Sequence, residues 1–162
     1  MSPHGLPQNK DVKDLLDMLL GKDVVLAPGE PVTSEETPGP TTAVYVDDTN
    51  CLSAVVMMDM ALTAYAGAAI GLVPAGGAQA ALEEWSVPEN LQNNAHEVLN
   101  VLAALLCDST DVHQRLYETY TAHEALPGDV VAWSAQPSPR RDVAVEIKGY
   151  GTGRLSIVNA LP

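Results

Sequence analysis

The spacing of apolar and polar residues along the chain predicts both helices and antiparallel strands. Apolar residues recur at helical spacing through 88–106, which predicts the longest helix. The buried stripe of this helix is expected to consist of Leu91, Ala95, Leu99, Leu102, Leu105 and Leu106. Two apolar runs, 43–46 and 51–58, flank the polar segment 47–50 and predict a β-hairpin.

A second hairpin is predicted near the end of the chain. The apolar runs 143–147 and 155–158 flank the glycine-rich segment 149–153. A phosphate-binding loop would need a helix directly after its glycines, and no helical pattern follows here, so a hairpin turn is the better interpretation. An alanine-rich helix is expected over 60–72, with Asp59 placed to cap its first turn.

The first 40 residues predict an N-terminal helix and a flexible loop. Leucines share one face of a helix over 11–20, and 23–27 has the composition of a short strand. Residues 28–40 are rich in Pro, Gly, Thr and Glu, which predicts an exposed, mobile loop. The organised α+β domain is expected to span 41–162, within one structural domain overall.

The remaining segments are shorter. Residues 75–78 are expected to form a flexible break, and 80–85 a helical turn. Alternating side chains over 116–122 favour a strand, with a short helix as the alternative, and 127–135 predicts a helical turn. This order predicts an α+β fold with a single, mainly antiparallel sheet and helices packed on one side.

The charge balance excludes one class of partner. Acidic residues outnumber basic ones by 21 to 8, giving a formal net charge of −13. A nucleic-acid-binding protein needs a basic surface, so we expect no nucleic-acid partner and no anionic membrane. The apolar run 54–73 is long enough to span a bilayer, but it contains Asp59 and Thr63, so a strand followed by a helix fits it better.

The two cysteines indicate the compartment. Cys51 and Cys107 have no metal-binding or redox spacing, and each borders an apolar run, so both are expected to be buried free thiols in a reducing compartment. The first residues lack an apolar signal core. The sequence therefore predicts a cytoplasmic protein.

A polar set interrupts the apolar pattern of the long helix. Asn93, Glu97 and Asn100 lie four and three positions apart and so share one helical face, with His96 beside them. The carboxylate of Glu97 can pair with a cation, and the carboxamide of Asn100 can orient a water molecule. A simple solvated helix face explains the same spacing.

The segment from His96 to Asn100 approaches the zinc motif HExxH, but asparagine replaces the second histidine. The other histidines have no supporting spacing: His4, His113 and His123. Three aspartates near the first hairpin are explained as a turn and a helix cap: Asp47, Asp48 and Asp59. We therefore predict no metal site.

The polar set resembles a motif of the CheC/CheX group of chemotaxis phosphatases. That motif is Asp or Ser, three residues, Glu, two residues and Asn on one helix. Glu97 and Asn100 match it, whereas Asn93 stands in the first place and Ala104 replaces a common glycine. The strand-to-helix segment 52–59 and the element order are also similar to the family, and the single motif resembles the CheX branch.

This resemblance implies a phosphatase acting on the aspartyl phosphate of a CheY-like response regulator. Asn100 would position the attacking water and Glu97 would pair with the regulator's lysine, with Asn93 and His96 contacting the partner. Magnesium would be held by the regulator, so the chain would have no cofactor of its own. The resemblance also implies a homodimer. A non-catalytic CheX-like binding or dimerisation module is the alternative.

Overall fold

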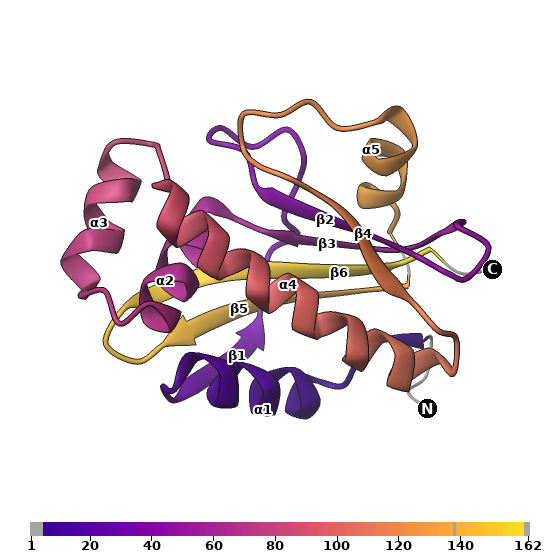
Figure 1. Cartoon of the computed structure of the whole chain (residues 1–162), viewed down its shortest axis with the longest axis horizontal. Coiled ribbons are helices and arrows are strands. Elements are labelled where there is room, and N and C mark those ends of the chain that lie inside the picture. The colour runs from indigo at the N-terminus through magenta and orange to yellow at the C-terminus, as the bar shows by residue number, and fades with distance from the viewer. Residues whose placement is uncertain (1–4, 138, 161–162) are drawn as a thin grey trace.

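The computed structural model describes residues 5–137 and 139–160. Within them, six strands form one antiparallel sheet in the order β1-β5-β6-β3-β2-β4 (Figure 1). The strands are β1 (Val24–Pro28), β2 (Thr41–Val46), β3 (Leu52–Met58), β4 (Arg115–Tyr120), β5 (Arg140–Ile147) and β6 (Gly151–Asn159). The helices are α1 (Asn9–Leu20), α2 (Met60–Ile70), α3 (Ala75–Glu83), α4 (Glu89–Thr110) and α5 (Gly128–Ser134). The predicted α+β fold with a single antiparallel sheet is confirmed.

Both predicted hairpins belong to this sheet. β2 pairs with β3, β5 pairs with β6, and the β3–β6 pairing joins the two hairpins. The strand predicted near residues 23–27 forms β1 and adds to the edge beside β5. The strand predicted over 116–122 forms β4 at the other edge, beside β2.

One face of the sheet is covered by α1, α2 and α4, and α4 crosses this face diagonally (Figure 1). Buried leucines of α4 and the alanine-rich surface of α2 fill the main core. Gly67 of α2 lies against the backbone of Leu91 in α4, and Asn94 Nδ2 donates to the Gly67 carbonyl over 3.0 Å. The small residues of α2 therefore allow close helix packing.

Asp59 caps α2 as predicted. Its Oδ1 accepts hydrogen bonds from the backbone N–H groups of Leu62 (2.8 Å) and Arg154 (3.0 Å). Its Oδ2 pairs with Arg154 Nε at 3.1 Å, and the same guanidinium pairs with Glu36. The cap thereby links α2, β6 and the loop before β2.

The opposite face carries a smaller core and corrects two expectations. The loop over 28–40 was expected to be exposed, but Val32 is fully buried and its N–H donates to Ser156 Oγ over 2.9 Å. Val32 is buried there because this face of β3 and β6 is apolar and needs cover. The helix α5 also packs on this face through Val130, so the helices are not all on one side.

Residues 75–78 were expected to be a flexible break, and this was wrong. They form the first turn of α3, preceded by Pro74 at the cap position. Ala78 and Ala81 are buried in the main core. Tertiary packing therefore stabilises a helix whose glycines alone would disfavour it.

The prediction of two buried thiols was also wrong for one of them. Cys51 is exposed, because it lies in the turn before β3, where its N–H donates to Asp47 Oδ1 over 3.1 Å. Cys107 is half-buried and its thiol donates to the Gln114 carbonyl. Among the described residues, no helix combines the length and the apolar character needed to cross a membrane.

Candidate functional site

The exposed face of α4 brings together the residues that the sequence singled out. Asn93, Glu97 and Asn100 are all exposed, and Ala104 continues the same stripe one turn further. The opposite stripe is buried in the main core, including Leu91, Ala95, Leu99 and Leu102. The 3.6-residue period of one helix produces both stripes.

Glu97 and Asn100 point their polar groups to solvent. Within the described part of the chain, neither side chain makes a hydrogen bond or an ion pair. A carboxylate can accept hydrogen bonds from a cation, whereas a carboxamide can both donate and accept. The pair is therefore available to contact a second molecule.

His96 lies on the flank of this stripe, in a cleft of about 310 Å³. Its Nε2 is 3.3 Å from Nε2 of Gln92, which also donates to Thr41 Oγ1 over 3.0 Å. The cleft is lined by Met60, Val87, Glu89, Gln92, Asn93, His96, Thr121, Ala122 and His123. Asn93 thus belongs to both the stripe and the cleft.

Burial lowers the pKa of His96, and the nearby carboxylate of Glu124 opposes this effect only in part. The folded state therefore favours the neutral imidazole over the charged one. Near neutral pH, His96 presents an uncharged ring beside Asn93.

Acidification is expected to destabilise the folded chain through His96. At pH values well above the ordinary histidine pKa of about 6.5 the imidazole is neutral in both states, so it contributes no pH dependence. Below that value the unfolded chain binds the proton first, and folding stability falls as the pH drops further. Urea unfolding at pH 8 and pH 5 should show a smaller pH effect in His96→Gln, and an unchanged pH effect would contradict this role.

Sequence reasoning did not single out Gln92 or the segment 121–123, which complete the cleft. Gln92 precedes His96 by one helical turn, and that spacing was the available signal. No signal in the sequence placed 121–123 beside α4. Among residues 5–137 and 139–160, no group of three or more His, Cys, Asp or Glu side chains is arranged to bind a metal ion. His4 lies outside the described residues.

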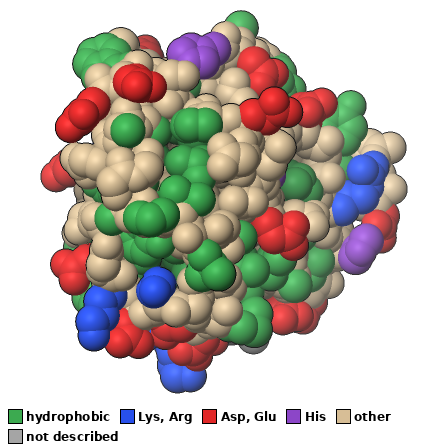
Figure 2. All heavy atoms as spheres, turned by 60° about the vertical axis from the view of Figure 1, so that its left-hand side comes forward, with side chains coloured by type: hydrophobic (Ala, Val, Ile, Leu, Met, Phe, Trp, Pro, Cys, Tyr) green, Lys and Arg blue, Asp and Glu red, His purple; other side chains and the backbone are tan. Residues whose placement is uncertain are grey.

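The surface charge follows the composition. On the side that carries α3, Figure 2 shows acidic side chains spread around a band of hydrophobic ones, with Lys and Arg at the lower and right-hand margins. Leu72 and Trp85, which flank α3, are both exposed. The acidity favours cationic groups on any partner of this surface.

No family model matches the chain, and no curated protein matches it in sequence. Solved structures match it in fold. A chain of the FliM–SpeE complex from H. pylori has a TM-score of 0.59 at 10% identity, covering 93% of this chain and 80% of that chain. The FliM middle domain from Vibrio alginolyticus has a TM-score of 0.58 at 11% identity, covering 92% and 86%. A chain of the FliG–FliM complex from H. pylori has a TM-score of 0.54 at 11% identity, covering 93% and 85%.

These matches show a shared fold. The chain has a CheC-like fold, and the FliM middle domain has the same fold. At 10–11% identity they carry no information on individual residues. The function must therefore be argued from the side chains of this chain.

Proposed function

We propose that this chain is a phosphatase that docks the exposed face of α4 on a CheY-like receiver domain and hydrolyses its aspartyl phosphate. One observation carries the proposal. Glu97 and Asn100, which match the motif of the resembled family, lie exposed on the same helical face, and their polar groups have no hydrogen-bond partner among the described residues. A rigid helix can insert two such groups together into a partner's site.

The proposed roles follow from the chemistry of the two side chains. The carboxamide of Asn100 orients a water molecule in line with the phosphoryl group, because it can accept from and donate to that water. The carboxylate of Glu97 pairs with a lysine of the receiver domain. The receiver's own magnesium supplies charge neutralisation, so no cofactor is assigned to this chain.

The neighbouring residues extend the contact. Asn93 and the neutral His96 face the partner at the edge of the cleft. This chain and the receiver domain must lie in the same compartment. The sequence predicts that this chain is in the cytoplasm. Association into a homodimer stays a prediction.

A second candidate is a binding module of the same fold without catalytic activity. Two observations favour it. Asn93 stands where the resembled motif has Asp or Ser. The matched FliM structures include complexes with FliG and with SpeE, so that fold engages protein partners in those cases.

Dephosphorylation of the host's receiver domains separates the two candidates. Each receiver is phosphorylated with radiolabelled acetyl phosphate, and the loss of label is followed with and without the chain. Catalysis predicts faster loss at substoichiometric amounts of the chain. Binding of a receiver without faster loss would support the binding module, and neither binding nor faster loss with any receiver would remove the phosphatase.

A further inference from the structure

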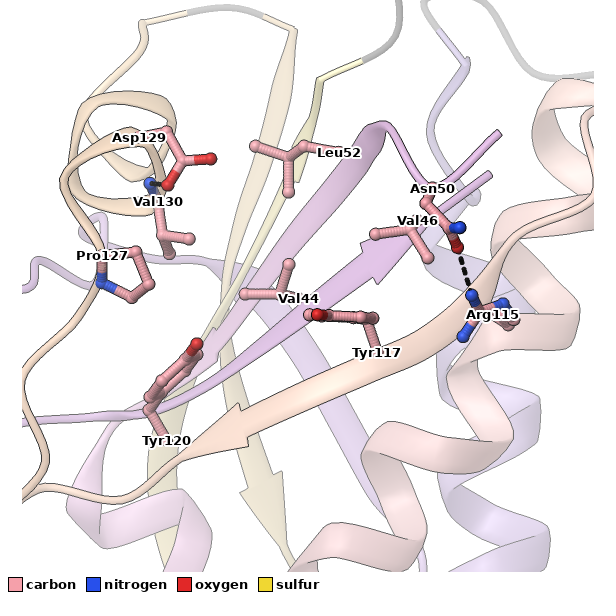
Figure 3. A pocket seen from close by; sticks show the side chains of 10 residues that line it. All are labelled: Val44, Val46, Asn50, Leu52, Arg115, Tyr117, Tyr120, Pro127, Asp129 and Val130. Carbon is pink, nitrogen blue, oxygen red and sulfur yellow. Dashed lines mark hydrogen bonds between the residues drawn. The ribbon is translucent and has the colours of Figure 1, made fainter. Parts of the chain in front are cut away.

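The face of the sheet opposite α4 holds a groove of about 400 Å³ between β4 and α5 (Figure 3). Val44 and Val46 of β2 form its apolar floor. Tyr117 and Tyr120 of β4 line one side, and Val130 of α5 lines the other. The remaining lining residues are Asn50, Leu52, Arg115, Pro127 and Asp129.

The groove exists because the second core covers only part of this face. The loop over 29–40 and the seven-residue helix α5 bury Val55, Met57 and Val158 on β3 and β6. The groove lies along the half formed by β2 and β4. There Tyr117 keeps 59% of its surface exposed. The exposed Tyr117 side chain leaves this side of the groove open to solvent.

A bulge in β4 directs Tyr117 into this groove. Val44 pairs with Glu118 and Tyr45 pairs with Leu116, so Tyr117 is an extra residue in the strand. A bulge changes the direction of a side chain and locally interrupts the hydrogen-bonded pairing of the two strands. Figure 3 shows the Tyr117 ring directed toward Val44. The local irregularity thus adds an aromatic surface to an apolar floor.

The two ends of the groove differ in charge. At one end, the Arg115 guanidinium donates to the Asn50 carboxamide and is held in place. At the other end, burial raises the pKa of Tyr120, and the carboxylates of Glu118, Asp129 and Glu124 raise it further. The Asp129 carboxylate lines the groove at that end, so the end is negative, and the Tyr120 phenol stays a hydrogen-bond donor.

We propose that this groove binds an extended segment of a partner protein in which two or three apolar residues are followed by lysine or arginine. The volume of the groove falls within the range of ligand sites, roughly 300–1,000 Å³. Its open side fits a continuous chain better than an enclosed small molecule. The acidic end beside Tyr120 selects the basic residues by charge complementarity. This site is on the opposite face from Glu97 and Asn100, so it is independent of the proposed function.

Two end-blocked fluorescent peptides test the proposal. One has the sequence Leu-Val-Leu-Gly-Lys-Lys, and the other ends in Glu-Glu instead. Anisotropy titrations should give the lysine peptide a roughly tenfold lower Kd, since charges of opposite sign attract at this end and like charges repel. High salt should reduce the difference between the two Kd values, because it screens the charges.

Variants locate the binding. Tyr117→Ser should weaken binding of the lysine peptide about tenfold, as expected for loss of an aromatic contact. Asp129→Asn should reduce the preference for lysine over glutamate. Met18→Ser, which removes another exposed apolar side chain on α1, should leave both Kd values unchanged.

The proposal would be overturned by any of three outcomes. The lysine peptide could fail to bind measurably, the two peptides could have equal Kd values, or Tyr117→Ser could leave the Kd of the lysine peptide unchanged. Binding of the aromatic sulfonate dye ANS that depends on Tyr117, with no peptide binding, would assign the groove to small molecules instead.

Discussion

Gly67→Ala is expected to destabilise the chain by about 1–3 kcal/mol, the range found when a well-packed core is overfilled. A Cβ atom on Gly67 would overlap the backbone carbonyl group of Leu91, because that Cβ would lie only 2.8 Å from the Leu91 carbonyl carbon. The obstacle is backbone rather than a movable side chain, so α2 and α4 must separate. That shift also strains the hydrogen bond from Asn94 to the Gly67 carbonyl.

Helix propensity alone predicts the opposite sign, because alanine is favoured over glycine within a helix by about 1 kcal/mol. Gly76→Ala in α3 is the matched control, since a Cβ there meets no atom of the described residues within 4 Å. Urea unfolding should show destabilisation at Gly67 and a small stabilisation at Gly76. Equal stabilisation at both positions would show that the two helices do not pack as closely as described.

Local signals explain which parts of the fold were predictable. The hairpin of β2 and β3 follows from two apolar runs around Asp47, whose Oδ1 accepts from the N–H groups of Thr49 and Cys51 in the turn. The cap at Asp59 and the long periodic pattern of α4 are likewise encoded within a few turns. Each depends on neighbours in sequence, which pattern reasoning can detect.

Long-range contacts explain what was not predictable. The pairing of Val24 with Ile147 joins residues more than a hundred positions apart, and no local pattern specifies it. The helix α3 forms despite Gly76 and Gly77 because its alanines pack in the main core. In the second core, Val32 looks like an ordinary loop residue until β3 and β6 are placed beneath it.

The candidate site divides in the same way. Exposure of Asn93, Glu97 and Asn100 follows from helical spacing, which the sequence contains. The cleft beside His96 depends on the segment 121–123, which the pairing of β4 with β2 brings next to α4. Only the tertiary structure could show that Asn93 and His96, the two predicted partner-binding residues, line the same cleft.

Asn100→Ala is expected to lower the rate of receiver dephosphorylation by about a hundredfold, because a misplaced attacking water costs on that order. The fold should be retained. Asn100 is exposed and makes no hydrogen bond within the described residues, so its loss should change stability by less than ~0.5 kcal/mol. Single-turnover decay of the phosphorylated receiver measures the first effect, and urea unfolding measures the second.

Glu97→Ala should act differently, because it removes a charge-assisted contact rather than the group that guides water. At saturating chain, the decay rate should stay close to that of the wild type, whereas the concentration needed for half-maximal rate should rise. Asn90→Ala removes another exposed carboxamide from α4 outside the motif and should change neither quantity. If Asn100→Ala unfolds the chain, the residue is structural. If all three variants behave alike toward a receiver that the wild type dephosphorylates, the exposed face of α4 is only a solvated surface and the catalytic groups lie elsewhere.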